Sequence, residues 1–338
     1  MSMLFRTLGL ALCLVAASTG LTQTLTKTGT TAAALLKIGL GARPIGMGGA
    51  FAASSDDLSS IYWNPAGLGA SYGSKAVFNH VNWIADVALE HAAVAIRVGD
   101  VGVLGAFVTA LTMDEMPVRT LEAPEGTGER FTAGGLVAGV TYARALTDNF
   151  SIGFNAKYVT ENIWNSSASA FALDVGTLYR IPVLNELRLA ASVSNFGTKM
   201  KMEGRDNLEI MQVGGSDGNL INTYVEYDQF DLPLLFRVGV AADLVKAETM
   251  RLTAELDAVH PNDNTEYINV GTEVAWTETV FLRAGWKSLF ERDTEQRFTL
   301  GVGFHYRFAD AVLLALDYAY QDFGRLNNVQ YLSVGVEF

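Results

Sequence analysis

Apolar and polar residues alternate with a period of two along most of the chain after residue 75. In residues 297–307, every second side chain is aliphatic or aromatic, and those between are small, polar or charged. The same alternation marks residues 151–158, 251–258 and 280–287. It predicts β-strands with one apolar and one polar face. A soluble sheet produces this pattern with its apolar face on a core, and a membrane barrel with that face on lipid.

The length and number of these segments favour the membrane barrel. Many run for about ten residues or more, as a tilted transmembrane strand requires. We count about fourteen segments, and bacterial single-chain barrels have an even number of strands. Aromatic residues that belong at the membrane surfaces fall near segment ends: Tyr142, Tyr158, Tyr179, Trp276, Trp286, Tyr306, Tyr318 and Tyr320.

Connection lengths alternate along the chain. Short turns are expected near residues 99–100, 146–149, 181–186, 243–248, 276–279 and 308–310. Longer connections are expected near residues 114–130, 162–167, 197–229, 260–265, 289–295 and 322–328, after a tight first hairpin near Asp86. Outer-membrane barrels have short periplasmic turns and longer extracellular loops. We therefore predict an all-β, transmembrane antiparallel β-barrel in a bacterial outer membrane, with both termini periplasmic.

The two ends of the chain fit this prediction. Arg6 precedes a short apolar core, and small residues follow it, which is the layout of a signal peptide over residues 1–22, cleaved between residues 18 and 23. Cys13, the only cysteine, lies in that core, and the bulky Leu12 before it disfavours lipoprotein processing. At the other end a strand finishes on Phe338. A terminal aromatic there resembles the assembly signal of outer-membrane proteins.

Composition and motifs exclude several classes of function. The formal net charge is −12 and no basic stripe occurs, which argues against nucleic-acid binding. The four histidines lack metal-ligand spacing, and no Gly-x-Ser-x-Gly elbow is present. Asp263 lies in an Asn-rich stretch that we interpret as a turn rather than a calcium site. We expect no enzymatic activity, cofactor or metal.

A region rich in Gly, Ala, Ser and Thr precedes the strands. It contains GARPIGMGGAF (residues 41–51), an Asp pair, and YWNPAGL (residues 62–68). The glycines do not form a nucleotide-binding loop, because no strand precedes them and no Gly-Lys-Ser/Thr follows. They predict a compact segment with close backbone packing and unusual dihedral angles.

These motifs resemble the N-terminal signature of the PorV/PorQ family, which is related to FadL-type long-chain fatty acid transporters. Further matches are SNFGTKM (194–200), HPNDNTE (260–266) and DYAYQDFG (317–324), so the resemblance covers residues 27–338. It implies a barrel of about fourteen strands over residues 73–338 and a hatch in its lumen over residues 23–72. The implied hatch motif comprises Gly41, Arg43, Pro44, Gly46, Gly48, Gly49, Asp56, Asp57, Trp63, Asn64, Pro65 and Gly67.

Charged residues on the inferred inner faces form a second candidate site. Both signs of charge are present. These residues either form ion pairs that hold a plug or line a water-filled path, and the high cost of burying single charges favours the ion pairs. The residues are Lys157, Asp174, Arg188, Arg237, Arg251, Glu255, Asp257, Glu273, Arg283, Lys287, Arg297 and Asp317.

The longest expected loop, residues 197–229, carries apolar side chains: Met200, Met202, Leu208, Ile210, Met211 and Val213. A partner surface and a lid over the barrel mouth explain them equally well.

Three functions follow as hypotheses. The leading one, implied by the resemblance, is a barrel that binds protein partners in type IX secretion or surface attachment. The alternative is a FadL-like transporter of hydrophobic small molecules, with an apolar pocket between hatch and loops. The third is a structural barrel that has lost both roles. Outer-membrane lipid surrounds the barrel in all three.

Overall fold

The computed structural model describes residues 27–338, except 71–72, 184, 215–217, 292–293 and 309–311. The expected signal peptide and Cys13 lie outside the described residues. No helix among the residues described is long and apolar enough to cross a membrane.

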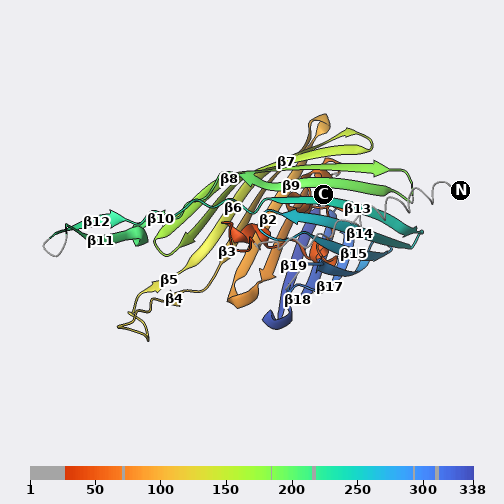
Figure 1. Ribbon diagram of the computed structural model, residues 1–338. Helices are drawn as coiled ribbons and strands as arrows, with labels where there is room; N and C mark the ends of the chain where they lie inside the picture. The colour runs from red at the N-terminus through yellow and green to blue at the C-terminus, as the bar shows by residue number, and fades with distance from the viewer. Residues whose placement is uncertain (1–26, 71–72, 184, 215–217, 292–293, 309–311) are drawn as a thin grey trace, which may run out of the picture.

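Fourteen long strands form a closed antiparallel barrel, which confirms the predicted fold (Figure 1). Each pairs with its neighbours in sequence, and β1 pairs with β19 to close the ring, with Lys75 opposite Glu337. The strands are β1 (Lys75–Asn82), β2 (Ala88–Val98), β3 (Gly102–Thr112), β6 (Ala133–Thr147), β7 (Phe150–Ile163), β8 (Ser166–Ile181), β9 (Leu187–Gly197), β13 (Leu235–Lys246), β14 (Met250–Pro261), β15 (Tyr267–Trp276), β16 (Val280–Leu289), β17 (Phe298–Phe308), β18 (Val312–Asp322) and β19 (Asn328–Glu337).

Exposure alternates along these strands in the sense that a membrane barrel requires. In β8, small and polar side chains face inward and are buried, whereas Phe171, Leu173 and Val175 face outward. In β17, Leu300 and Val302 are about half exposed while Thr299 is buried. The outer surface is therefore apolar and the inner surface polar, the reverse of a soluble barrel.

All connections at one end of the barrel are short, and the long connections lie at the other end. One end, here called the turn end, has brief connections such as η4 (Gly99–Val101) and residues 247–249, together with Lys75 and Phe338. The other, the loop end, has η3 (Ile84–Asp86), η6 (Gly324–Leu326) and two long excursions. These carry the hairpins β4 (Met116–Pro117) with β5 (Arg130–Phe131), and β11 (Leu208–Val213) with β12 (Asn219–Tyr224), which Figure 1 shows on the same side.

One expected long connection is a tight turn. Residues 162–167 were expected to form a loop, but β7 and β8 are joined by Trp164 and Asn165 alone. The small polar residues that suggested a loop are strand residues: Ser166 is buried on the inner face, and its hydroxyl donates to Asp206.

Residues 27–70, here called the N-terminal segment, cross the lumen from one end to the other. At the loop end, Thr31 forms a bridge with Asp231. At the turn end, Ser74 exchanges backbone hydrogen bonds with Phe338, just before β1. The elements of the segment are η1 (Ala34–Lys37), α2 (Ala42–Gly46), α3 (Ser60–Trp63) and η2 (Pro65–Ala70). The domain boundaries predicted near residues 23 and 72 remain predictions, as does the side of the membrane on which the termini lie.

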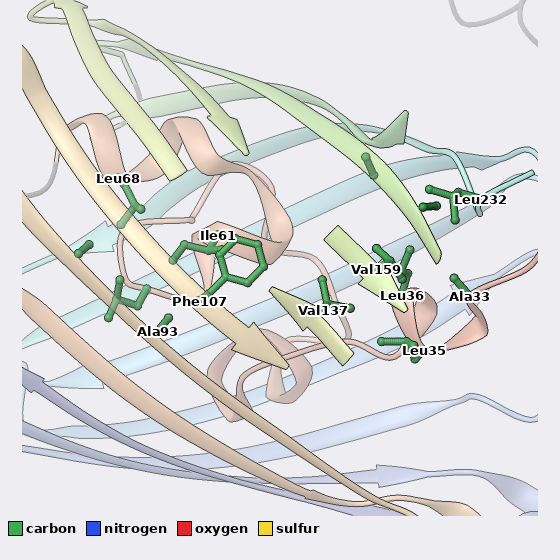
Figure 2. Close-up of a cluster of buried hydrophobic side chains, with 14 of the residues drawn as sticks. Ala33, Leu35, Leu36, Ile61, Leu68, Ala93, Phe107, Val137, Val159 and Leu232 are labelled. Atoms are coloured by element: carbon green, nitrogen blue, oxygen red, sulfur yellow. The ribbon is translucent and has the colours of Figure 1, made fainter. Parts of the chain in front are cut away.

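Apolar side chains of the N-terminal segment pack against inward-facing side chains of the wall. Figure 2 shows one cluster, in which Leu35, Leu36 and Ile61 lie with Phe107 of β3 and Val137 of β6. A second cluster joins Ile45, Phe51 and Trp63 to wall residues such as Leu89 and Tyr331. The segment is thus part of the core of the molecule.

Candidate functional site

Two carboxylates of β14 hold the middle of the N-terminal segment. Asp257 Oδ2 accepts from the backbone N–H groups of Phe51 and Ala52 at 2.9 and 3.0 Å. The Glu255 carboxylate accepts from the next two N–H groups, at 2.6 and 3.0 Å. Four successive backbone donors are therefore satisfied by side chains of the wall, as buried polar groups require.

A larger network centres on Glu273 of β15, which is fully buried. Its carboxylate lies 2.9 Å from Arg43 of the segment, 3.2 Å from Arg251 and 2.8 Å from Arg283. The Arg283 guanidinium also lies 2.6 Å from Asp317. Both signs are paired here, which supports the ion-pair hypothesis for these lumen charges over a water-filled lining.

Arg43 links Glu273 to the Asp pair of the segment. Its guanidinium contacts Asp56 and lies 3.0 Å from Asp57. Burial alone would lower the pKa of Arg43, but these carboxylates and Glu273 raise it well above its ordinary value. Burial would likewise raise the pKa of Asp56, but Arg43 outweighs this and lowers it.

Two smaller groups hold further charges of the inner face. Lys157 lies 2.7 Å from Asp174, which also accepts from Asn155 and from the backbone of Asn195. Arg188 lies 2.8 Å from Asp243 near the turn end.

Arg297 does not join these groups. It was predicted on the inner face but is exposed, because it precedes β17 at the loop end, where its backbone N–H donates to Asp322. Arg237 and Lys287 are buried, but neither forms an ion pair with a described residue.

The glycines of the hatch motif let the segment approach the wall closely. Gly48 and Gly49 have φ angles of 69° and 74°, which side chains rarely adopt, and Gly41 has 88°. A Cβ on Gly48 would collide with the backbone of Trp286, and one on Gly67 with Ser55. Gly46 lies against Gly301 of β17 in the same way.

The Trp-Asn-Pro part of the motif is held from both sides. Trp63 donates its indole N–H to Leu40 at 2.8 Å. Asn64 donates to the carbonyls of Ala52 and of Thr177 in β8. Pro44 and Pro65 lie in the short helices α2 and η2 and are buried.

A mostly apolar cavity lies between the N-terminal segment and the wall, chiefly strands β2, β3 and β6, and its lining also includes charged residues such as Lys157, Asp174 and Arg237. Its walls include Leu35, Leu36, Ile61, Phe107 and Val137 (Figure 2). Its volume is about 30 Å³, whereas a cavity of about 150 Å³ holds benzene. An aromatic molecule can therefore enter only if the segment moves.

Two roomier cavities lie at the ends of the lumen. At the loop end, an apolar groove of about 200 Å³ is bounded by Leu111, Met113, Ala133 and Ile163. Leu35, which lines the inner cavity, packs against Gly135, the neighbour of the groove residue Gly134. At the turn end, a cavity of about 380 Å³ runs beside Arg43, Phe281 and the β18–β19 wall.

The long loop after β9 divides into two parts. Met200 is buried beside Leu232, and Met202 is half-buried. Leu208, Ile210, Met211 and Val213 are exposed on the β11–β12 hairpin. The first part packs down on the barrel, as a lid would, and the second presents apolar side chains outward.

The remaining candidates are placed as follows. Phe338 is exposed at the turn end, and its role as an assembly signal remains a prediction. Asp263 accepts from Thr31 and Lys37, both at 2.7 Å, so it fastens the segment at the loop end. Among the described residues, no group of three His, Cys, Asp or Glu side chains is placed to hold a metal ion.

The cavity residues Leu35, Leu36, Phe107 and His91 were not among the sequence candidates. A signal for two of them was present, because Phe107 and His91 occupy inward positions of their strands, where side chains are otherwise mostly small or polar.

Comparisons with known proteins support the fold. No family model and no curated protein matches the chain. The barrel is similar to the toluene transporter structures TbuX of Ralstonia pickettii (TM-score 0.56, 14% identity, 88% of this chain and 97% of that chain) and TodX of Pseudomonas putida (0.54, 13%, 88% and 97%). It is also similar to the CymD monoaromatic hydrocarbon channel (0.52, 13%, 89% and 98%). At these identities the likeness is one of fold.

Proposed function

We propose that this protein is an outer-membrane barrel that admits hydrophobic small molecules, with the N-terminal segment as its plug. The observation that carries the proposal is the apolar cavity between the plug and the wall. A polar lumen has no need of aliphatic side chains at its centre. Apolar side chains there would bind a hydrophobic molecule favourably, because its apolar surface would be removed from water.

The outer surface supports the membrane location. Aliphatic and aromatic side chains cover it on all sides, including Phe171, Leu300, Val302 and Trp286. Exposed apolar area of this extent is tolerated in lipid but not in water.

The loop-end groove supports a route for the cargo. It is apolar, and Leu35 of η1, which lines the inner cavity, packs against Gly135 of β6, next to the groove residue Gly134. The solved barrels of similar fold are described as toluene and monoaromatic hydrocarbon channels. Together these favour the FadL-like alternative over the secretion hypothesis.

A reversible cross-link of η1 tests the proposal. Leu35→Cys and Gly135→Cys would place thiols on the two sides of the contact, in a mature chain that otherwise has no cysteine once the predicted signal peptide is removed. In proteoliposomes, a short bis-methanethiosulfonate linker should abolish toluene uptake, and reduction should restore it.

The matched control carries Thr120→Cys and Glu125→Cys in the exposed β4–β5 loop. The linker should leave its uptake unchanged. Wild-type protein that gives no more toluene uptake than empty liposomes would refute the proposal.

Binding of protein partners is the second candidate, because the β11–β12 hairpin presents exposed apolar side chains. Ile210 and Leu220 are 68% and 70% exposed. Deleting residues 208–224 should alter the secreted or surface-attached proteins of the source cell if the hairpin recruits a partner. An unchanged protein set in that strain and in a full gene deletion would exclude this function.

A further inference from the structure

A fourth cavity, of about 170 Å³, lies at the loop end between the N-terminal segment and strands β13–β16. The apolar cavity adjoins it, since Leu36, Tyr62, Asn195 and Arg237 line both. Its character differs, because phenol, amide and ammonium groups line it, including Tyr62, Tyr267, Asn269 and Lys287.

Arg237 of β13 is a buried cation without an ion-pair partner among the residues described. It is 4% exposed, and its guanidinium lies 5.0 Å from the Trp63 ring and 5.5 Å from the Tyr62 ring. Its Nη1 is buried and donates to no described group. A buried, unused guanidinium donor is costly unless something accepts from it.

Lys287 of β16 brings a second cation to the same cavity. It is 8% exposed. The register between β15 and β16 shifts at Ile268 and Val270, and this bulge makes both Lys287 and Ser288 buried. Bulges commonly re-aim side chains at functional sites.

The other charges of the cavity leave one positive charge in excess. Lys37 is paired with Asp263 at 2.7 Å. Glu291 is the remaining carboxylate in the lining, and it forms no ion pair with Arg237 or Lys287. The described lining thus offers two unpaired cations for one unpaired carboxylate.

We propose that this cavity binds a small anion of the carboxylate or phosphate class, held by Arg237 and Lys287. A guanidinium and an ammonium group are the usual protein partners of such anions. The adjoining apolar cavity, of about 30 Å³, leaves no room for a long alkyl chain behind the anion, and such a chain would enter only if the N-terminal segment moved. The anion would join the plug, through Tyr62 and Trp63, to the wall, and the inference does not depend on hydrocarbon transport.

Titration of the purified full-length protein in detergent tests the site. Inorganic phosphate, acetate and dodecanoate are added separately, the last below its micelle concentration, with chloride at matched ionic strength as the reference. Binding is followed by calorimetry and by tryptophan fluorescence, since Trp63 lies beside Arg237. Phosphate or acetate should bind saturably.

Variants locate the site. Lys287→Met and Arg237→Gln should each weaken binding by about tenfold or more, as expected when one charge-assisted hydrogen bond is lost. The control Lys246→Met, at a cation 55% exposed near the turn end, should bind like wild type. If Arg237→Gln does not fold, Lys287→Met carries the test.

Three outcomes would overturn the proposal. They are no saturable binding of phosphate or acetate to the wild type, an equal loss in the Lys246→Met control, and binding of dodecanoate alone. The last would assign the cations to the head group of an amphiphile instead.

Discussion

At the scale of single residues, Glu273 is central to how the N-terminal segment is held. It is the shared partner of three arginines, one from the N-terminal segment and two from the wall. Removing its charge takes away the one carboxylate that Arg43, Arg251 and Arg283 share, although each keeps another carboxylate partner. The repulsion among the three guanidinium groups is then less compensated, and it is far stronger in a protein interior than in water.

Glu273→Gln should therefore destabilise the protein by about 3–5 kcal/mol, the usual cost of breaking a buried pair. The measurement is the urea midpoint of unfolding, followed by tryptophan fluorescence in detergent. Glu278→Gln is the control, because Glu278 pairs with the same Arg251 but is 61% exposed. Its effect should stay below about 1 kcal/mol, and equal effects in the two variants would contradict the role given to Glu273.

Gly153 of β7 tests the close contact beneath η2. A Cβ at this position would collide with the backbone of Pro65, so Gly153→Ala should displace η2 at a cost of about 1–3 kcal/mol. Increased protease cleavage within residues 60–70 would report the displacement. Gly335→Ala is the matched control, since a Cβ there meets its nearest neighbour at an ordinary 3.5 Å. Similar cleavage in both variants would argue against the contact.

The ion pair of Asp56 with Arg43 predicts a dependence on pH. The folded-state pKa of Asp56 is lowered from its ordinary value of 3.8. A lowered pKa stabilises the folded state above the ordinary value, and this contribution is lost as the pH falls through the folded-state pKa. Wild type and Asp56→Asn should thus differ in unfolding midpoint from about pH 5 to about pH 8, and the difference should shrink only as the pH falls below 3.8 toward the folded-state pKa. A constant difference over the whole range would contradict the assignment.

At the scale of elements, the strands could be predicted from the sequence because burial on one face imposes the two-residue period. The prediction of a long connection around Trp164 and Asn165 was wrong. Ser166, which follows, was read as a loop residue, yet a small polar residue is well suited to an inner strand position. Composition alone does not separate these two environments.

For the N-terminal segment, the sequence predicted the packing but not the contact partners. Its glycines and the Trp-Asn-Pro motif predicted close packing, and the structure places these residues against the wall. The wall residues that contact them could not be predicted from the sequence, because the partners lie far apart along the chain: Arg43 and Glu273 are 230 residues apart. The prediction that Arg297 lies on the inner face was wrong for a related reason, since the period of two does not mark where a strand begins.

At the scale of the whole molecule, the apolar outer surface of the barrel is suited to contact with lipid. Val302 lies outward near the middle of β17 and is 50% exposed. Val302→Arg should reduce folding stability in a bilayer by about 2–4 kcal/mol, as for a cation at the midplane of other barrels. Urea titration in liposomes measures it. Leu121→Arg, at a fully exposed loop tip, should have no effect, and a tolerated arginine at residue 302 would exclude a lipid-facing position.

The course of the N-terminal segment through the lumen also sets an order for biogenesis. The residues made first bond to those made last: Ala42 to Ser333, and Gly48 to Thr299. If β1 and β19 met around an empty lumen, the buried carboxylates of β14 and β15 would lack partners, and the segment would then have to be threaded through a finished ring. We therefore expect the segment to be laid in place before β1 pairs with β19. Closure of the ring and filling of its lumen would then be one coupled event late in assembly.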